Sequence, residues 1–550
     1  MEKIRVTFEN NELIEVPKMT TLLELSKKVN RKYPILLAEV NNELRELHNI
    51  LDRDCSVRFL DITDANGFRA YQRSVVFLMI CATKDVLGVL SRVRVEHSIN
   101  KNYYCEIDDE NVEITESLLN SIEDKMREYI ESGTMIEKKP LPTDEAIQIA
   151  EQFGLYDKMN ILKYKRTSNV NFYKLGKYYN YFYGQMVLDT SRLRKFKLSK
   201  SDSGFMLQFP SSNAPGDLAE LKSVKKITQI FNESNRWSRI LKISTVGELN
   251  NAICQGNLGD IIRISEALHE KKIAYIADMI LEQKKNIILI SGPSSSGKTT
   301  FAERLCIQLR VNGLRPHVIS LDNYFFNREF VPLDEFGKPN FENLDFLDVE
   351  QINKDLVNLL KGETVEFPTY NFITGKREYK GNYKKLNSDE VIVMEGIHGL
   401  NEKLSADIPR ANKFKIFISA LTQLNIDDHN RIPTSDTRLI RRIVRDSIYR
   451  NYSAQNTIDI WPKVLKGEIR NIFPFQEEAD ALFNSALIYE MCVLRQFVES
   501  GLFDIDRQCK EFVEARRLVK FLDCFQCINS EQIPPNSILR EFIGGSCFHA

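Results

Sequence analysis

The spacing of apolar and polar residues changes character several times along the chain. At the start, Lys3–Phe8 and Leu13–Val16 alternate as strands do, and two asparagines between them supply a turn. Thr21 then caps a short amphipathic helix. Two further short strands follow, around residues 35–40 and 56–60. A hairpin, one helix and more strands in so short a stretch predict a β-grasp domain over residues 1–62.

Residues 63–240 have a mixed pattern that predicts an α+β domain. Helical periodicity and capping residues indicate three helices, and an aromatic-rich stretch indicates strands. The predicted helices are Ser74–Leu90, Ile114–Ser132 and Thr143–Phe153, and the strands lie within Asn171–Phe196. Residues 241–285 then read as a helical connector.

From residue 286 the chain alternates strand and helix, as a doubly wound α/β domain does. Its strands are short, uninterrupted apolar runs, which are typical of parallel strands buried on both faces. The predicted strands are Asn286–Ile290, His317–Leu321, Val391–Met394 and Lys415–Ile418. We therefore expect a parallel α/β domain over residues 286–485 and a helical extension over residues 486–550.

Size and composition narrow the class of protein. The 550 residues are 43% hydrophobic and 27% charged, with a formal net charge of -1. These values are those of a globular protein with several domains and no global positive field for nucleic acid or membrane. The longest apolar run, Ser74–Thr83, is too short to cross a bilayer, so a cytoplasmic protein without membrane contact is expected.

Cysteine usage predicts reduced thiols. The ten cysteines are irregularly spaced, which does not suggest a disulfide framework. One close pair, Cys524 and Cys527, has no second pair and no histidine nearby. We interpret these two as small apolar residues at a helix end rather than as a zinc or redox site.

The strongest motif is G-x-x-x-x-G-K-T, which lies between the first predicted α/β strand and the following helix. Its glycines let the backbone curl so that N–H groups point at phosphate oxygens, and the helix adds its positive dipole end. Lys298 would reach the β and γ phosphates, and the Thr299 hydroxyl would hold Mg²⁺. The nucleotide-binding set is Gly292, Pro293, Ser294, Ser295, Ser296, Gly297, Lys298, Thr299 and Thr300.

Other charged residues favour phosphoryl transfer. Asp322 and Glu395 each follow a predicted strand, so both belong at the sheet edge where ligands bind in such folds. Arg438, Arg442 and Arg445 share one helix face, where guanidinium groups can stabilise a migrating phosphoryl group. A GTPase would need the guanine-binding motif Asn-Lys-x-Asp. The nearest match, at residues 353–356, has its aspartate one position too early.

Read together, these motifs resemble the uridine/cytidine kinase and phosphoribulokinase family over residues 286–485. The motifs are G-P-S-S-S-G-K-T-T, S-L-D-N-Y-F, N-F-E-N-L-D, F-P-T-Y-N-F, V-M-E-G-I and R-L-I-R-R-I-V-R-D. The resemblance implies ATP and Mg²⁺ as cofactors, with Thr299 and Glu395 at the metal, and suggests a homo-oligomer. It makes Asp322 the base for a nucleoside 5'-hydroxyl, with Lys298 and Arg445 also catalytic. The implied acceptor-side and lid residues are Glu342 for the ribose hydroxyls, Tyr370 for the base, and Arg442, Arg445 and Arg450 for the lid.

Two departures leave the acceptor open. Gly375 stands where the family has a histidine that reads the pyrimidine, and Tyr452 stands where the lid has a second arginine. Uridine or cytidine, a modified nucleoside and another small alcohol therefore all remain candidates.

The first 240 residues resemble the N-terminal half of threonyl-tRNA synthetase. Residues 1–62 are similar to its TGS domain, and residues from 63 to about 230 to its editing domain. The four editing-site positions, a His-x-x-x-His and a Cys-x-x-x-His pair, are here Arg73, Phe77, Phe182 and Met186. No metal ligand or proton carrier remains among them, which predicts a module kept for binding or regulation.

That module supplies an alternative function, RNA or tRNA binding. Five cations are interleaved with aromatic residues that could stack on bases. The residues are Arg192, Arg194, Lys195, Lys197 and Lys200, with Phe196 and, before them, Tyr178, Tyr179, Tyr181 and Tyr183. The kinase and RNA-binding hypotheses are compatible. Retention of Lys298, Thr299, Asp322 and Glu395 favours an active enzyme.

Overall fold

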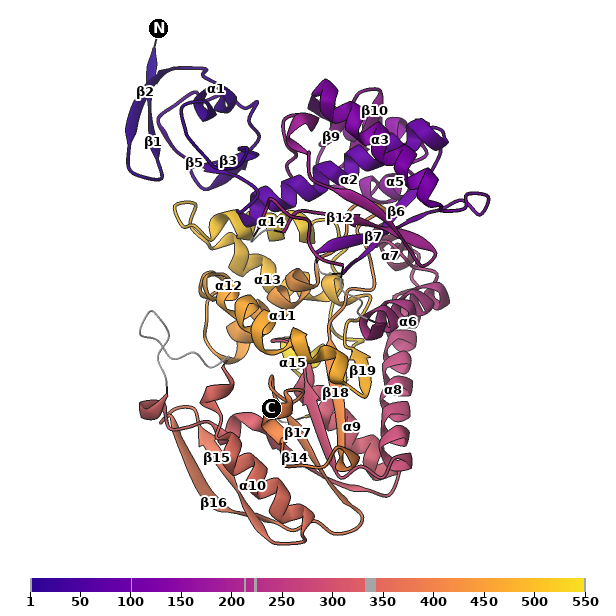
Figure 1. The fold of residues 1–550 in the computed structure, drawn as a ribbon, viewed down its shortest axis with the longest axis vertical. Helices are drawn as coiled ribbons and strands as arrows, with labels where there is room; N and C mark the ends of the chain where they lie inside the picture. Colours follow the sequence, from indigo (N-terminus) through magenta and orange to yellow (C-terminus); the bar gives the residue numbers. More distant parts are fainter. Residues whose placement is uncertain (1, 100, 212–213, 222–224, 332–342, 549–550) are drawn as a thin grey trace.

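The computed structural model describes residues 2–99, 101–211, 214–221, 225–331 and 343–548. Figure 1 shows the N-terminal sheet at one end and the β15–β16 hairpin at the other, with the long helix α8 running alongside. Among the described residues, no helix is both long and apolar enough to cross a membrane.

The N-terminal segment folds as the predicted β-grasp. Its elements are β1 (Lys3–Phe8), β2 (Leu13–Pro17), α1 (Leu22–Ser26), β3 (Leu37–Val40), β4 (Glu43–Arg45) and β5 (Cys55–Leu60). The sheet order is β2-β1-β5-β3-β4, with β1 parallel to β5. Helix α1 begins where expected, because Thr21 and Glu24 form a reciprocal capping box.

The next segment is the predicted mixture of helices and strands. Its elements are α2 (Ala65–Leu87), β6 (Val93–Ile99), β7 (Asn102–Ile107), α3 (Glu116–Ser132), β8 (Ile136–Pro142), α4 (Thr143–Gln152), α5 (Tyr156–Leu162), β9 (Asn169–Leu175), β10 (Tyr178–Tyr181), β11 (Lys197–Ser201) and β12 (Gly204–Gln208). Strands β8–β10 form one antiparallel sheet, and β6, β7, β11 and β12 form another.

Two boundaries differ from the sequence prediction. Helix α2 begins at Ala65, nine residues before the predicted start, because the uniformly apolar run marks only the part of the helix that is buried all round. The predicted strands in 171–196 end at Tyr181, and the remainder is irregular apart from one turn at Thr190–Arg192.

Three of the aromatic residues proposed for RNA stacking are buried. Tyr178, Tyr181 and Phe196 are each at most 5% exposed, and their rings pack in the core. Tyr178 and Tyr181 belong to β10, whereas Phe196 lies in the irregular segment before β11. These three rings are therefore not available to stack on bases, and Tyr179 and Tyr183 are partly exposed.

The predicted connector contains α7 (Val246–Cys254) and α8 (Leu258–Glu282), and a further helix, α6 (Lys225–Leu241), precedes it within the segment predicted as the α+β domain. Helix α7 ends at Cys254, and Gly256 two residues later has a φ of 85°, a left-handed conformation that glycine adopts without strain. Helix α8 then lies against α9 of the α/β domain (Figure 1).

The α/β domain has the predicted doubly wound parallel sheet. Its strands are β13 (Ile287–Ser291), β14 (Arg315–Ser320), β17 (Glu390–Glu395), β18 (Lys413–Ser419) and β19 (Ala481–Asn484), in the order β14-β17-β13-β18-β19. All neighbouring pairs are parallel. The helices are α9 (Lys298–Val311), α10 (Val349–Leu360), α11 (Thr434–Tyr449) and α12 (Ala454–Asn471), and β15 (Val365–Asn371) pairs with β16 (Lys376–Lys384) as a separate hairpin.

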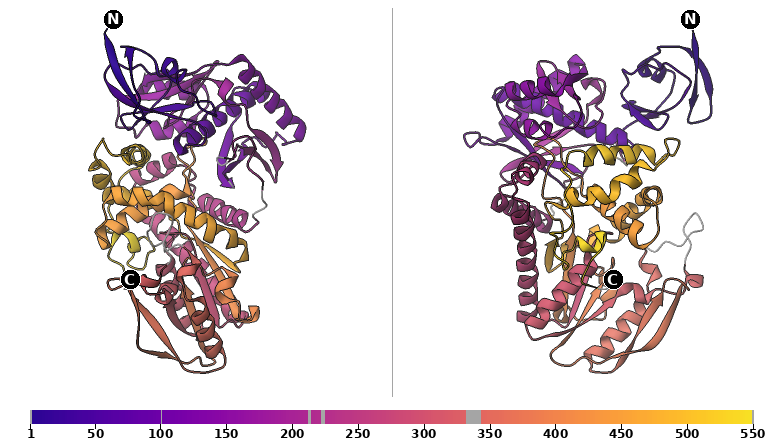
Figure 2. Two further views of the ribbon diagram at one scale, coloured as in Figure 1. Left: turned by 60° about the vertical axis from the view of Figure 1, so that its left-hand side comes forward. Right: turned by 180° about the vertical axis from the view of Figure 1, so that it is seen from behind.

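The C-terminal segment forms α13 (Glu490–Phe503), α14 (Phe512–Leu522) and α15 (Arg540–Ile543). Figure 2 shows these helices between the N-terminal segments and the parallel sheet. Cys524 is buried and Cys527 is exposed, and neither forms a disulfide.

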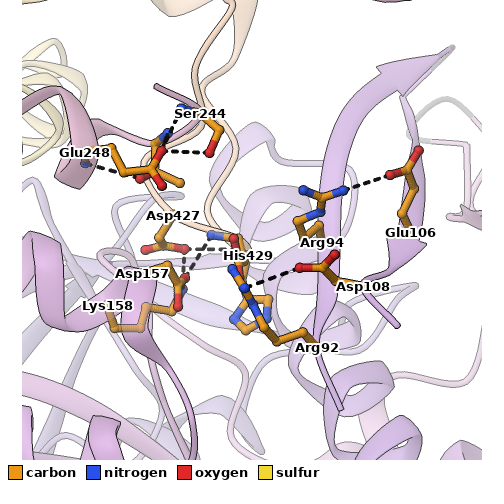
Figure 3. A network of polar contacts seen from close by, with 12 residues as sticks. Arg92, Arg94, Glu106, Asp108, Asp157, Lys158, Ser244, Glu248, Asp427 and His429 are labelled. Atoms are coloured by element: carbon orange, nitrogen blue, oxygen red, sulfur yellow. Dashed lines mark hydrogen bonds and ion pairs between the residues drawn. The ribbon is translucent and has the colours of Figure 1, made fainter. Parts of the chain in front are cut away.

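The two halves of the chain share a core and a buried polar network. One apolar cluster joins residues of α4, α5 and β9 to residues of β13, β18 and α11. Beside it, the fully buried Lys158 forms ion pairs with Asp157 and with Asp427, which lies in the loop before α11 (Figure 3). The neighbouring Asp428 accepts from Arg92 at 2.8 Å. Since an ammonium already sits among these carboxylates, the group does not require a metal ion.

Candidate active site

The phosphate loop connects β13 to α9 and has the backbone shape that the motif predicts. Gly297 has a φ of 82° and precedes the first residue of α9. A Cβ on Gly292 would lie 2.3 Å from the carbonyl oxygen of Ile418, so only glycine fits there. The hydroxyl groups of Ser295 and Ser296 are buried and have no hydrogen-bond partner in the described part of the chain. These two hydroxyls are therefore available to a ligand in the loop.

Lys298 lies on the first turn of α9 and folds back across the loop. Its ammonium donates to the carbonyl oxygens of Gly292 at 3.0 Å and Pro293 at 3.3 Å. Thr299 follows on the exposed side of the helix start. The ammonium and the hydroxyl thus stand at the positive end of the helix dipole.

A second layer of charged residues braces the loop from behind. Glu468 of α12 accepts from the backbone N–H of Ser294 at 2.9 Å and forms a two-pronged ion pair with Arg438 of α11. Arg441 donates to the Ser295 carbonyl at 3.3 Å and pairs with the buried Glu490. Arg438 and Arg441 therefore hold the loop in shape and are not free to move onto a substrate.

The C-terminal segment also contacts the loop. Glu541 of α15 accepts from the backbone N–H of Thr300 at 3.2 Å and from its hydroxyl at 2.9 Å. Ile538 lies against Gly297, where a Cβ would come within 2.5 Å of it. A carboxylate thus stands at the N-terminal end of α9, where an anion is stabilised by N–H groups and the helix dipole.

Three charged residues meet at the carboxyl edge of the sheet. Asp322 follows β14 and Glu395 ends β17, and these strands are neighbours with Ser320 level with Glu395. Lys298 comes from the start of α9, which follows the adjacent strand β13 through the phosphate loop. Burial raises the pKa of Asp322, and the charge of Lys298 partly offsets this. Burial, with repulsion from Asp322 and Glu541, raises the pKa of Glu395 to about 7.

The arginines predicted for the lid gather around one buried carboxylate. Asp446 of α11 pairs with Arg442 at 3.2 Å, with Arg445 at 2.8 Å and with Arg450 at 3.5 Å. Arg442 also donates to the Ser294 hydroxyl at 2.8 Å, which brings it to the phosphate loop. Arg450 influences the pKa of Asp322, so the guanidinium cluster extends toward the strand-end carboxylates.

The acceptor-side residues are placed by the β15–β16 hairpin. Tyr370 is 4% exposed, its ring packs on Phe325 and Phe372, and its hydroxyl has no hydrogen-bond partner among the described residues. Gly375 has a φ of 69° in the hairpin turn, and a Cβ there would lie 2.9 Å from the side chain of Arg328. Glu342, the predicted ribose ligand, lies outside the described residues.

Several charged residues at this site were not identified from the sequence. Glu468, Glu490 and Glu541 come from helices that follow the loop by 170 residues or more, and none belongs to a motif. The only signal in the sequence is their occurrence in helices of the α/β half and its extension. Such a signal does not select a particular glutamate.

Comparison with known proteins identifies the family. The model of the phosphoribulokinase/uridine kinase family matches residues 287–488. A uridine kinase from Ligilactobacillus salivarius is 32% identical over 185 residues, which are 34% of this chain and 78% of that protein. This chain belongs to the phosphoribulokinase/uridine kinase family. A second uridine kinase, from Mycoplasma genitalium, is 34% identical over 167 residues, 30% of this chain and 69% of that protein.

The N-terminal half of this P-loop kinase has a different relationship. A threonine–tRNA ligase from Clostridium kluyveri is 27% identical over 198 residues, which are 36% of this chain and 31% of the ligase. The kinase therefore carries a threonyl-tRNA synthetase-like module at its N-terminus. Because the match spans about a third of the ligase, the ligase's activity is not transferred to this chain.

Proposed function

We propose that this kinase transfers the γ-phosphoryl group of ATP to the 5'-hydroxyl of a nucleoside, with uridine or cytidine as the first candidates. One observation carries the proposal. The phosphate loop with Lys298, the carboxylate of Asp322 and the carboxylate of Glu395 all lie at the same edge of one parallel sheet. A phosphate donor, a metal and an acceptor hydroxyl need groups of these kinds at one place.

The residues present fit ATP and Mg²⁺. The unpartnered hydroxyls of Ser295 and Ser296 and the N–H groups of the loop suit phosphate oxygens. The Thr299 hydroxyl and the Glu395 carboxylate are oxygen ligands, which Mg²⁺ prefers. Bound Mg²⁺-ATP supplies the phosphoryl group, and Thr299 and Glu395 would hold the metal directly or through water.

In the proposed reaction Asp322 orients the acceptor hydroxyl and accepts its proton. The hydroxyl oxygen forms a bond to the γ-phosphorus while the bond to the β,γ-bridging oxygen breaks, and ADP leaves. Lys298 and the guanidinium groups of Arg442, Arg445 and Arg450 stabilise the charge that spreads over the transferring group. Because Asp446 already holds these three arginines, little reorganisation is needed when the lid closes.

The acceptor side supports a polar ring-containing substrate. Tyr370 offers a buried hydroxyl, without a partner among the described residues, beside the rings of Phe325 and Phe372. At the position of the expected pyrimidine-reading histidine, Gly375 forms a tight turn filled by Arg328. We therefore propose that Arg328 takes part in acceptor selection, with Glu342 as the ribose ligand.

The test is ADP release by the full-length protein with Mg²⁺-ATP and single nucleosides. Stimulation by uridine or cytidine is the expected result, and Arg328→Ala should then change the preference among nucleosides more than the maximal rate. If ATP binds but no nucleoside or small alcohol increases ADP release, the proposed function is wrong.

A further inference from the structure

A second cavity lies far from the phosphate loop, where three parts of the chain meet. Its volume is about 230 Å³. The β4 region of the N-terminal sheet forms one wall, the start of α2 and residues 183–185 form the floor, and α14 forms the other wall. The C-terminal extension of the kinase therefore helps to build a pocket on the synthetase-like module.

The pocket is strongly basic. Seven of its lining side chains are basic and two are acidic. Four of the cations have carboxylate partners: Arg45 pairs with Glu43, Lys138 with Glu46, Arg69 with Glu514, and Arg517 with Glu514 and Asp436. The other three, Arg73, Arg516 and Lys520, form no ion pair with any carboxylate of the described residues. The pocket thus has three positive charges that the protein does not balance.

Of these three cations, Arg73 is half-buried, and its side chain forms part of the pocket floor. Its guanidinium donates to the carbonyl oxygen of Gln185 and lies 5.8 Å from the centre of the Tyr183 ring. A Cβ on Gly184 would lie 2.4 Å from the guanidinium carbon, so glycine is needed for this close approach. Burial lowers the pKa of Arg73, which indicates that its charge lacks a compensating anion.

Arg73 is one of the four positions that the resemblance to threonyl-tRNA synthetase matches to an editing site. The other three positions, Phe77, Phe182 and Met186, are at most 2% exposed, and the two rings pack 5.5 Å apart. Apolar packing therefore fills three of the four positions, and of the four only Arg73 lines the pocket.

Arg516 and Lys520 stand one turn apart on α14 at the exposed rim of the pocket. Burial, followed by the positive charges of Lys138 and Arg516, lowers the pKa of Lys520, and the charges of Glu46 and Glu43 offset this only in part. These rim cations repel one another unless an anion lies between them. With the Arg73 guanidinium beneath, they form a cluster suited to a tetrahedral oxyanion.

We infer that this pocket binds a small phosphate-bearing molecule, held by Arg73, Arg516 and Lys520. The volume suits one or two phosphate groups with a small body rather than a folded nucleic acid. The inference is independent of the proposed kinase reaction, since no residue of the phosphate loop lines this pocket.

The test uses inorganic pyrophosphate and isothermal titration calorimetry. The full-length protein carries Lys298→Ala so that binding at the phosphate loop is weakened. Arg516→Gln/Lys520→Gln removes two pocket charges. Lys197→Gln/Lys200→Gln removes two exposed charges on β11 and is the matched control. Lys520→Arg alone keeps the charge, and thermal melts confirm that each variant is folded.

The expected result is one pyrophosphate site that the pocket double variant weakens by at least about tenfold and the control leaves within about twofold. Lys520→Arg should retain most of the affinity. Absence of binding in the Lys298→Ala protein, or equal weakening in the pocket and control variants, would overturn the inference. A short single-stranded RNA that binds and is sensitive to the pocket variant, while pyrophosphate does not bind, would also overturn it and favour RNA.

Discussion

The contact between Glu541 and the start of α9 gives a sharp prediction about ATP affinity. Glu541 holds the backbone N–H and the hydroxyl of Thr300, which belong to the predicted nucleotide-binding set. A phosphate oxygen that takes this N–H must displace the carboxylate or remain beside it. Glu541→Gln keeps the shape of the side chain and removes its charge, so the variant should bind ATP more tightly.

The size of the effect follows from the geometry. A carboxylate at a helix N-terminus with charge-assisted hydrogen bonds of this length contributes about 1–2 kcal/mol. Release of that interaction on ATP binding should make the dissociation constant of Glu541→Gln about 5- to 30-fold lower than that of the wild type. Without ATP the variant should lose about 1 kcal/mol of stability, because the helix dipole loses its anion.

The assay is calorimetric titration of the full-length proteins with Mg²⁺-ATP. Glu531→Gln is the matched control, since Glu531 is exposed on the same C-terminal segment and, within the described residues, accepts a hydrogen bond only from the neighbouring Asn529. An ATP affinity of Glu541→Gln that is unchanged or weaker, with the control also unchanged, would refute the competition between Glu541 and the nucleotide.

Three further predictions concern the site and its support. Asp322→Asn should bind ATP normally and lose at least about 100-fold in phosphoryl transfer, measured as product formed per turnover; near-normal turnover would remove Asp322 as the base. The pKa of Glu395 is raised to about 7, so the folded state favours the protonated carboxyl group. The contribution of this group to the free energy of unfolding is fully present below pH 4.5 and is lost as the pH rises through 7. Glu395→Gln should therefore be more stable than the wild type by about 2–3 kcal/mol at pH 8 and nearly equal at pH 4.5 in urea unfolding, and an equal gain at both pH values would contradict this. Lys158→Met leaves Asp427 buried without its cation and should cost about 3–5 kcal/mol in the same assay, whereas Lys510→Met, at an exposed pair, should cost less than about 1 kcal/mol.

Much of the parallel domain could be predicted from local sequence. The phosphate loop, Asp322 and Glu395 are each attached to a buried strand, and parallel strands bring their carboxyl ends to one edge. Short, uninterrupted apolar runs were enough to locate these strands, because both faces of the sheet are buried. The start of α2 was missed because Arg69 and Arg73, which face the basic pocket, interrupt the apolar pattern there.

The supporting residues could not be predicted for a different reason. Glu468 reaches Ser294 across 174 residues, and Glu541 reaches Thr300 across 241. The residues around a glutamate in a helix do not indicate which distant backbone N–H its carboxylate contacts. The stacking role predicted for Tyr178, Tyr181 and Phe196 is wrong because all three rings are buried, and the local pattern of aromatic and basic residues does not show burial.

The ion pair between Lys158 and Asp427 has a consequence for the history of the molecule. Its partners are 269 residues apart, one in the synthetase-like half and one in the loop before α11. Each charge is buried beside the other, so removing either one leaves an uncompensated charge in the interior. A substitution at either position then requires a compensating change in the other half. The ion pair thus ties the two halves together under selection, and related chains that keep both halves should change these two positions together.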